Sequence, residues 1–534
     1  MRGKLPVLIT VCLAVLAINL DTTIVNVALP SLSVDLGAGT RQLQWIVDGY
    51  NLAFAALVLA AGSLSDRYGR RPALIWGLLG FAAASVAGAL VTTPSALVVA
   101  RVAMGMCAAL IFPTTLSIIT NTFRDRRERA AALGVWGAVV GVGVAAGPVT
   151  GGLLLEHFAW GSVFWALVPL ALVAAAAAFV LVPESRDPSV GSLDRLGLVL
   201  SVLMLSGLTF TVIEAPERGW GSAATLVGFA LSAALLVAFV VVERRVARPM
   251  LDVSLFRDPR FSAASGAVTV TFFALFGFIF LITQYMQFVR GWGPLSTGAR
   301  ILPVALSIAV ASVLGALLAP RIGTKVVVTT GLLLFGAAFL WISTVDASTS
   351  YAAVIVPQMT LMGLGMGLIS TPATESILLV LPPARAGVGS AVNDATRELG
   401  GTLGVAVVGS LFSSVFAARL AEGDFESLPA ATLAAAQDSV GAATAVASGS
   451  PALTTAFQDA FMSGLHTSTL VVGFVCLAGA VAAAISLPGR GVGHLPGEAA
   501  PHPVSGPVSG PVSGPVSGPV SGEVDDTALA GADS

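Results

Sequence analysis

Ionisable side chains inside apolar stretches are the residues of this sequence that could do chemistry. Asp21 lies in INLDTTIVNVALP, Asp48 lies in QWIVDGYNL, and Arg101 lies in LVVARVAMGMCAA. A charge within the membrane interior costs about 3 kcal/mol on insertion scales, so such residues are usually paired or functional. Burial and a nearby guanidinium shift the pKa of a carboxyl in opposite directions, which suits reversible proton binding. We therefore expect these three residues to couple proton movement; a purely structural ion pair between Asp21 and Arg101 is the alternative.

The stretches that carry these residues are predicted to be membrane-spanning helices. The chain has 534 residues, of which 56% are hydrophobic and only 10% are charged, whereas a typical soluble domain has about 25% charged residues. Apolar blocks recur from Leu5 to Leu487, and each is long enough to cross about 30 Å of hydrocarbon as a helix. We therefore expect an all-α polytopic membrane protein with about fourteen transmembrane helices.

The positions of the basic residues predict which side of the membrane each loop occupies. The predicted spans begin near Leu5, Gln42, Pro72, Ala96, Ala130, Val163, Leu193, Thr225, Phe261, Ser296, Val326, Ala352, Ala395 and Ser463. With both termini in the cytoplasm, the inner segments hold 21 of the 27 Lys and Arg residues, and the outer loops hold five. This asymmetry agrees with the positive-inside rule. We expect a multi-pass protein of the cell membrane with both termini cytoplasmic and a long external loop over residues 417–462.

The first predicted span distributes its side chains over three faces. On a helix, its polar residues share one face, its apolar residues form a narrow stripe, and Asp21 points to a third side. The polar residues are Asn19, Thr22, Thr23 and Asn26, and the stripe is Leu20, Ile24 and Val27. Only the stripe suits lipid, so we expect protein or water around most of this helix. By helical rise, Asp21, Asp48 and Arg101 share a depth of roughly 10 Å below the outer surface.

An internal repeat predicts two related halves. The stretch GSLSDRYGRRPAL, residues 62–74, has an echo in ALLAPRIGTKVVV, residues 316–328. Transporters are commonly built from two such repeats, with the substrate site between them. We expect a first six-helix bundle (1–185), a two-helix linker insert (186–248), a second six-helix bundle (249–488) and a cytoplasmic tail (489–534). The tail repeats Pro-Val-Ser-Gly five times, a composition that cannot build a core and predicts disorder.

The loop after the second span is a candidate gate. Its residues of interest are Gly62, Asp66, Arg67, Gly69, Arg70 and Arg71. A carboxylate at this place can lie on the N-terminus of a neighbouring helix and lock one arrangement of the bundle. The alternative is that the three arginines only set the topology.

The fifth span is rich in glycine and contains a proline. Its residues of interest are Gly143, Gly147, Pro148, Gly151 and Gly152. Glycines spaced by four let two helix backbones approach closely, and proline bends a helix. We expect a seam at which the two halves seal; close packing alone is the alternative.

Other kinds of site find no support in the sequence. The three cysteines lie in apolar blocks, and the four histidines have no ligand spacing, so we expect no metal and no cofactor. No phosphate-binding loop is present, which argues against ATP as the energy source. The near-neutral net charge of −2 gives no basis for nucleic-acid binding. We interpret Glu375, Asp394, Arg397 and Glu398 as mostly structural, and we predict that the protein is not an enzyme.

Together these motifs resemble the major facilitator superfamily, and within it the fourteen-span drug:proton antiporter branch. The resemblance covers the chain from about Leu5 to Leu487 and rests on LDTTIVNVALP, GSLSDRYGRRPAL, RVAMGMCAA and GPVTGG. It implies the major facilitator fold, two six-helix bundles plus two extra central helices, and a proton-driven exporter of amphipathic drugs or antibiotics. It also implies coupling by Asp21 and Arg101, gating by Asp66 and Arg70, and a seam at Gly147 and Pro148. The sequence departs from the pattern of this branch in two places that concern proton coupling and substrate preference. AWGSVFWALVP lacks the arginine and asparagine that are usual between the fifth and sixth spans, and Met104 replaces the usual glutamine of the span-four motif.

The expected function is export of small molecules in exchange for protons by a monomer in the lipid bilayer. Candidate substrate-binding residues are Asn26, Gln284, Gln287 and Phe276. The second half has no deep acidic residue suited to multi-cationic drugs, which favours neutral, monocationic or anionic substrates. Proton-coupled uptake of a small metabolite and a non-transporting membrane sensor remain as alternatives.

Overall fold

The computed structural model describes residues 4–186, 194–246, 249, 251–380, 386–422, 425 and 428–487. The predicted tail, residues 489–534, lies outside the described residues. Fourteen helices in the described part are long and apolar enough to cross a membrane, which confirms the predicted number. Twelve of them begin within a few residues of the predicted starts. The thirteenth begins at Ala386, nine residues before the predicted Ala395, and the last begins at Pro451.

We call the helices from α1 to α7 the first half. They are α1 (Leu5–Asp35), α2 (Thr40–Tyr68), α3 (Arg70–Leu90), α4 (Pro94–Thr122), α5 (Arg126–His157), α6 (Ser162–Trp165) and α7 (Leu167–Leu181). The middle helices are α8 (Arg195–Arg218) and α9 (Ala223–Glu243). The second half contains η1 (Val253–Arg257), α10 (Pro259–Gln284), η2 (Tyr285–Val289), α11 (Pro294–Ile322), α12 (Thr324–Ile342), η3 (Tyr351–Ile355), α13 (Val356–Leu379), α14 (Ala386–Ala421), α15 (Ala430–Asp438), α16 (Val440–Ala447) and α17 (Pro451–Ser486).

Several of these helices begin at a capping side chain that is followed by proline. The Thr93 hydroxyl accepts from the backbone N–H of Ala96 before α4, and the Asp258 carboxylate accepts from the N–H of Arg260 before α10. Pro94 and Pro259 follow these caps. Proline suits this position because the first N–H groups of a helix have no partner within it. These local signals explain why the predicted helix starts were close.

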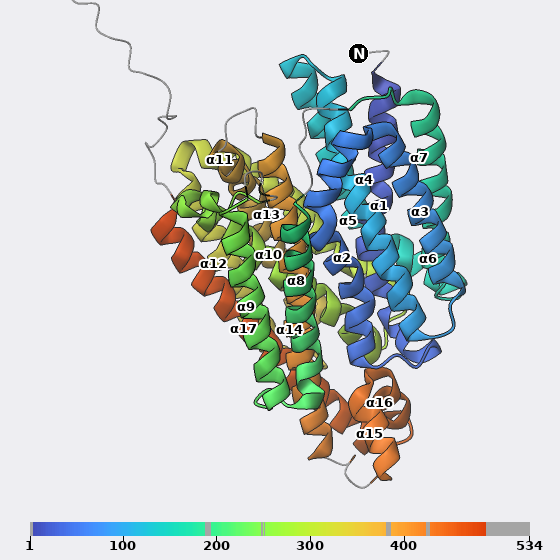
Figure 1. Ribbon diagram of the computed structural model, residues 1–534. Helices are drawn as coiled ribbons and strands as arrows, with labels where there is room; N and C mark the ends of the chain where they lie inside the picture. The colour runs from blue at the N-terminus through green and yellow to red at the C-terminus, as the bar shows by residue number, and fades with distance from the viewer. Residues whose placement is uncertain are drawn as a thin grey trace, which may run out of the picture. The chain divides into compact units, whose positions relative to one another are not determined.

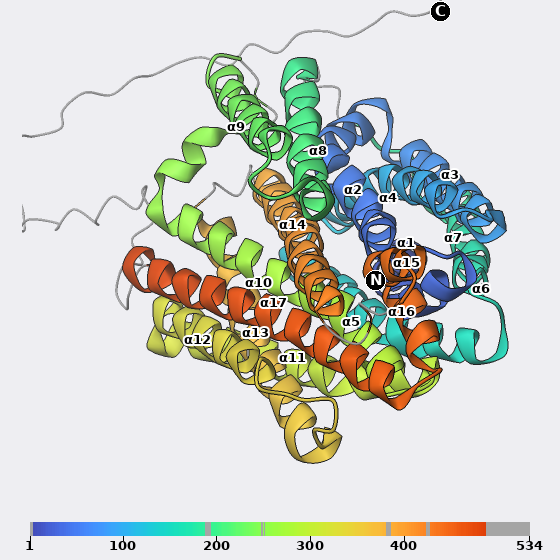
Figure 2. The same cartoon turned by 90° about the horizontal axis from the view of Figure 1, so that it is seen from below.

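The two halves meet at two pairs of helices. In the first half α1 packs on α5 and α2 on α4, and in the second half α10 packs on α14 and α11 on α13. Between the halves, α2 packs on α14 and α5 packs on α11. Figures 1 and 2 show α8 and α9 side by side at the edge where α2 and α14 meet, and α8 contacts both. The middle helices therefore cover one side of the contact between the halves.

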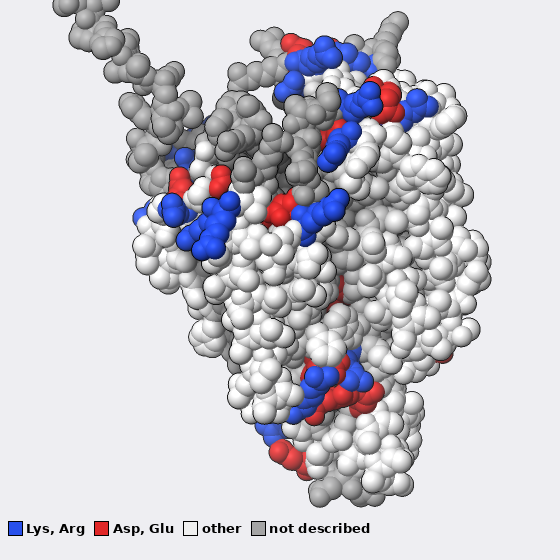
Figure 3. Space-filling view, in the orientation of Figure 1, with Lys and Arg blue, Asp and Glu red and all other residues white. Residues whose placement is uncertain are grey.

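Charged residues gather at the two ends of the molecule. Figure 3 shows an apolar middle with basic residues toward one end and a mixed charged cluster toward the other. We call the end at which α1 begins the basic end; it holds Lys4, Arg67, Arg70, Arg71, Arg124, Arg129, Arg244, Arg245, Arg257, Arg321 and Lys325. The opposite end, at which α1 ends, holds Arg41, Arg218, Arg290, Arg300 and Arg419. The division of basic residues between ends follows the alternation expected from the sequence.

The internal repeat reappears as a shared backbone conformation. Gly69 lies between α2 and α3 with φ of 120°, and Gly323 lies between α11 and α12 with φ of 95°. Both values lie in a region that favours glycine. Each glycine also donates its N–H to the carbonyl four residues earlier, of Ser65 and Ala319 respectively. The two junctions are therefore equivalent turns in the two halves.

The predicted external loop, residues 417–462, differs from a plain loop. Helix α14 continues to Ala421, the short helices α15 and α16 follow, and α17 begins at Pro451 rather than near Ser463. The segment is rich in alanine, which favours helix, and Ser439 caps α16 by accepting from the N–H of Ala442. Ser439 also contacts the hydroxyl of Ser33 near the end of α1, at 3.1 Å. This segment therefore covers the end of α1.

As much of α1 is buried as the sequence predicts, but the face that was expected to meet lipid is buried too. Its apolar window is 72% buried, as expected for a helix enclosed by protein. However, Leu20, Ile24 and Val27, the stripe that was expected to suit lipid, are buried as well. Ile24 packs where Gly147 and Gly151 of α5 leave room for it. Because these two glycines have no side chains, α5 can approach α1 closely and cover Ile24, which helical periodicity alone does not predict.

Close approach of α2 and α4 depends on Gly105, which is buried. A Cβ atom at this position would overlap the backbone carbonyl of Tyr50 in α2. The glycine therefore sets the distance between these two helices.

Gly105→Ala is expected to lower the melting temperature of the purified protein by several degrees, since the overlap costs about 1–3 kcal/mol. Gly266→Ala in α10 is the control because nothing lies within 4 Å of the position of its Cβ. Alanine favours helix over glycine by up to about 1 kcal/mol, so the control should keep or slightly raise the melting temperature. Equal melting temperatures for the two variants in a thermal unfolding assay in detergent would contradict the proposed role of Gly105.

Candidate functional site

The centre of the candidate site is an ion pair enclosed between α1 and α4. Nη1 of Arg101 donates to both carboxylate oxygens of Asp21, at 2.7 and 2.8 Å. The exposed fraction of the Arg101 side chain is 1% and that of Asp21 is 0%. Helix α1 continues to Asp35, so Asp21 lies near the middle of its 31-residue helix rather than near the end. The two charges neutralise each other in a place that water does not reach.

Helix α2 supplies two further contacts to the guanidinium of Arg101. Its Nε donates to the backbone carbonyl of Ile46 at 3.0 Å, and its central carbon lies 4.3 Å from the centroid of the Tyr50 ring. A cation over an aromatic face is attracted electrostatically, more strongly when both are desolvated. One side chain of α4 thus holds α1 and α2 together.

Tyr50 links this ion pair to the rest of the interior. Its ring stacks on Phe54 at 6.4 Å between centroids, and Phe54 packs edge-on against Phe112 of α4. Its hydroxyl is buried, lies near Thr22 and makes no hydrogen bond of good geometry. The hydroxyl therefore has hydrogen-bonding capacity that this arrangement leaves unused.

Asp48 is a second buried carboxylate, but it has no partner among the residues that the structure describes. Its exposed fraction is 0%, and neither of its oxygens accepts a hydrogen bond. It lies one helical turn from Gln44, whose amide donates to the carbonyls of Val405 and Ala406 in α14 at 3.3 and 3.0 Å. Asp48 is therefore on the face of α2 that packs against the second half, and the described contacts of Arg101 do not include it.

The candidate gating loop contacts α7 of its own half. The Asp66 carboxylate accepts from Nε of Arg70 at 2.7 Å, and the N–H of Arg70 donates to the carbonyl of Ser185. Arg71 donates to the carbonyl of Phe179 and lies over its ring. The lock expected from Asp66 on a neighbouring helix is instead an ion pair with the first turn of α3.

Two other residues of this loop have local contacts. Arg67 lies over the ring of the adjacent Tyr68, at 5.6 Å. Gly62 lies within α2 and faces Pro113 of α4.

The glycines of α5 form two faces. Gly143, Gly147 and Gly151 face Asn19, Thr23 and Ile24 of α1. On another side, Pro148 and Gly152 face Gly298 and Leu295 of α11. Helix α5 thus joins α1, which carries Asp21, to the second half.

An ion pair at the basic end also fixes α5 to α1. Nζ of Lys4 contacts the carboxylate of Glu128 at 2.7 Å, and this hydrogen bond lowers the pKa of Glu128. Helices α1 and α5 are therefore joined at the basic end as well as along their glycine contact.

The predicted substrate-binding residues are mostly engaged within the protein. The Gln287 amide in η2 donates to the carbonyl of Val27 in α1 at 3.0 Å, beside Asn26, which donates to the carbonyl of Thr22. Gln284 is buried and donates to the carbonyl of Phe280. Phe276 packs on Gly401 of α14. Of the four predicted residues, Asn26 and Gln287 therefore lie at a contact between α1 and the second half.

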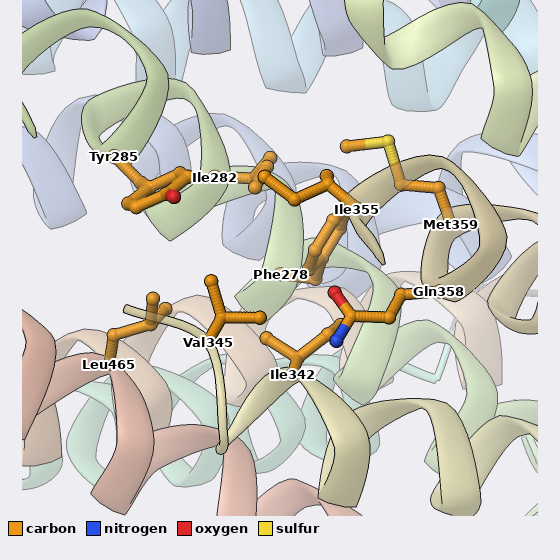
Figure 4. Close-up of a pocket in the computed structure, with 9 residues that line it drawn as sticks. All are labelled: Phe278, Ile282, Tyr285, Ile342, Val345, Ile355, Gln358, Met359 and Leu465. Atoms are coloured by element: carbon orange, nitrogen blue, oxygen red, sulfur yellow. The ribbon is translucent and has the colours of Figure 1, made fainter. Parts of the chain in front are cut away.

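An apolar pocket lies inside the second half and is lined by Phe278, Ile282, Tyr285, Ile342, Val345, Ile355, Gln358, Met359 and Leu465 (Figure 4). Its polar side chains are engaged: Tyr285 donates to the carbonyl of Asp346, and Gln358 donates to the carbonyl of Trp341. The lining comes from α10, η2, α12, η3, α13 and α17 with the loop after α12. This pocket is therefore not the site between halves that the repeat predicts.

Sequence reasoning missed two residues of the site, Tyr50 and Gln44. The signal for Tyr50 was its position two residues after Asp48, but its contact with Arg101 depends on the approach of α2 and α4. Glu398 was placed at a helix start near Ala395. The structure begins α14 at Ala386, which puts Glu398 inside the helix. Among the described residues no cluster of His, Cys, Asp and Glu could hold a metal ion.

Known proteins are similar to this chain in sequence and in fold. The chain matches the family profile described as Major Facilitator Superfamily over residues 11–405. It is 35% identical over 488 residues to the multidrug efflux pump LfrA of Mycolicibacterium smegmatis, covering 90% of this chain and 95% of the relative. It is 33% identical over 500 residues to the tetracenomycin C resistance and export protein of Streptomyces glaucescens, covering 91% and 92%.

Among solved structures, a bacterial homolog of the human lysosomal transporter Spinster in an inward-facing conformation is similar with a TM-score of 0.64. That chain is 18% identical, and the similarity covers 91% of this chain and 98% of the other. The fold and the family resemblance expected from the sequence motifs are confirmed.

A double-mutant cycle tests the ion pair. Asp21→Asn and Arg101→Gln should each destabilise the protein, by about 3 kcal/mol where a buried charge is left unpaired. The double variant should be more stable than the sum of the single losses predicts, because no unpaired charge remains. Thermal unfolding of the four purified proteins measures this coupling, and additive losses would show that the two side chains do not stabilise each other.

Proposed function

The chain belongs to the Major Facilitator Superfamily, and we propose that it is a proton-coupled exporter of amphipathic small molecules that works by alternating access. The observation that carries this proposal is the enclosed ion pair of Asp21 and Arg101 at the junction of α1, α2 and α4. The names of its relatives, a multidrug efflux pump and an antibiotic export protein, support the direction of transport and the class of substrate. The substrate crosses the membrane without a change in its covalent bonds.

Proton binding to Asp21 is the first step of the proposed coupling. A protonated carboxyl loses its negative charge, so Arg101 keeps only the carbonyl of Ile46 and the ring of Tyr50 as strong partners. The tie between α1 and α4 then weakens. The difference in attraction between Arg101 and the charged or protonated Asp21 is large in a low-dielectric site, because an ion pair there is screened little by water.

The movement of α1 can reach the second half through α5. Ile24 lies one turn from Asp21 and packs on Gly147 and Gly151 of α5. The adjacent face of α5, at Pro148 and Gly152, packs on α11. A change at Asp21 can therefore pass from α1 to α5, and from α5 to α11 of the second half.

Asp48 is proposed as a second proton-binding group. An ionised carboxylate that is buried without a partner is costly. Asp48 would therefore hold a proton while α2 and α14 are packed together, and loss of that proton would favour their separation. This role links proton binding to closure of the contact that Gln44 makes with α14.

The arrangement described here is proposed to be closed at the opposite end and open at the basic end. Contacts between the halves at the opposite end include Gln287 with Val27 and Pro148 with Gly298. Nearer the basic end, the same face of α5 carries three exposed glycines, where nothing lies within 4 Å of a Cβ position. These glycines are Gly134, Gly137 and Gly141.

The basic end is proposed to face the cytoplasm. The excess of Lys and Arg at this end supports that orientation through the positive-inside rule. With fourteen spans, both termini lie on that side of the cell membrane. We propose that a single chain forms the complete transport path, since both halves are present in it.

The proposed function predicts low accumulation of a cationic dye such as ethidium in cells that express the protein. A protonophore should raise accumulation to the level of cells without the protein. At constant internal pH, export should become faster as the medium is acidified, because each pH unit adds about 1.4 kcal/mol per proton. Asp21→Asn should abolish this proton-driven export, whereas Asp35→Asn, at an exposed position on the same helix, should export like the wild type.

Three outcomes of this experiment would contradict the proposal, provided that equal amounts of each variant reach the membrane. Export by Asp21→Asn at the wild-type rate would remove Asp21 from coupling. Greater dye accumulation on expression of the wild type would indicate uptake. Unchanged accumulation across a panel of dyes and antibiotics would indicate a protein that does not transport them.

A further inference from the structure

Glu398 is a half-buried acidic residue that the proposed coupling does not use. It lies in α14, and its Oε2 is buried without a hydrogen-bond partner. The neighbouring Arg397 points elsewhere: its guanidinium lies 4.5 Å from the centroid of the Phe272 ring and 3.9 Å from the carboxylate of Asp394. Among the described side chains, no cation forms an ion pair with Glu398.

The first half presents unpaired polar groups at the level of Glu398. Because α2 and α14 run in opposite directions, the contact of Gln44 with Ala406 sets their register. Seven residues farther along α2 is Asn51, and seven residues back along α14 is residue 399, a shift of roughly 10 Å in each helix. Asn51 and Tyr50 are therefore level with Glu398.

These two residues have hydrogen-bonding groups without partners. The exposed fraction of each is 1%, and neither the Asn51 amide nitrogen nor the Tyr50 hydroxyl makes a hydrogen bond. Tyr50 also carries the guanidinium of Arg101 over its ring, at 4.3 Å. Tyr50 therefore borders the ion pair of the first half and lies at the level of the carboxylate of the second.

Aromatic and backbone surfaces lie beside Glu398. Phe272 and Phe276 of α10 pack against Gly400 and Gly401, the residues that follow it closely in α14. The carboxylate of Asp394, one turn before Glu398, faces Arg397, which leaves one unpaired carboxylate beside aromatic walls. Such a site does not suit a metal ion, which needs several oxygen ligands. It suits a weakly hydrated organic cation, whose apolar groups pack on the rings.

We propose that Glu398 binds the positive group of a monocationic amphipathic substrate between the two halves, with Tyr50 and Asn51 facing it from α2. This inference rests on the proposed export function and names its substrate class. It also revises the expectation that the second half has no deep acidic residue. A positive charge at Glu398 lies at the level of Tyr50, which borders the Asp21–Arg101 pair, and added positive charge nearby disfavours a bound proton, so that substrate binding favours proton loss from that pair.

Binding of tetraphenylphosphonium to the purified full-length protein tests the inference. Equilibrium binding in detergent at constant pH, without a proton gradient, should show at least about a tenfold loss of affinity in Glu398→Gln, equivalent to about 1.4 kcal/mol. Glu398→Asp keeps the charge and should retain most of the affinity. Glu422→Gln, an exposed residue just after the same helix, is the matched control and should bind like the wild type.

Two results would overturn the inference. The first is wild-type affinity in Glu398→Gln, or no binding of the probe by the wild type. The second is an equal loss in Glu398→Asp and Glu398→Gln together with a lower melting temperature in both, which would indicate a structural role. Because binding is measured without transport, either result would leave the export test with Asp21→Asn unaffected, and a failure of export would not alter these affinities.

Discussion

The interaction on which the structure depends is the contact of one guanidinium with three helices in the membrane interior. Arg101 of α4 holds the carboxylate of α1 and a carbonyl and an aromatic ring of α2, and no water reaches it. A charge in this place must keep its partners, because the cost of an unpaired ion is several kcal/mol. Any change in the charge of Asp21 therefore requires a new arrangement of these helices.

The contacts between the halves begin at the same helices. Helix α1 transmits through the glycines of α5 to α11, and α2, which carries Tyr50 and Asp48, packs directly on α14. The proposed substrate group, Glu398, lies on that second path. A proton at Asp21 and a cation at Glu398 would thus act at the level of one aromatic ring, that of Tyr50, which is the proposed physical reason for their exchange.

Much of the fold could be predicted from the sequence because each span carries its own signals of apolar length, capping residues and flanking arginines. The pairing of Asp21 with Arg101 followed from their common depth. The contacts of Tyr50 and the burial of Ile24 did not, because they depend on where Gly105, Gly147 and Gly151 allow backbones to approach. The place of Glu398 inside a helix did not follow either, because α14 begins nine residues before the predicted Ala395, and the partner of Asp66 depends on the turn at Gly69.

The most direct measurement is proton release on substrate binding by purified protein in weakly buffered detergent solution. The account requires that binding of a monocationic substrate displaces a proton from the Asp21–Arg101 pair. Addition of ethidium to the wild type should therefore acidify the solution, and Asp21→Asn should release fewer protons at equal occupancy. The same proton release from Asp21→Asn and from the wild type would contradict the claim that this carboxyl exchanges its proton for substrate.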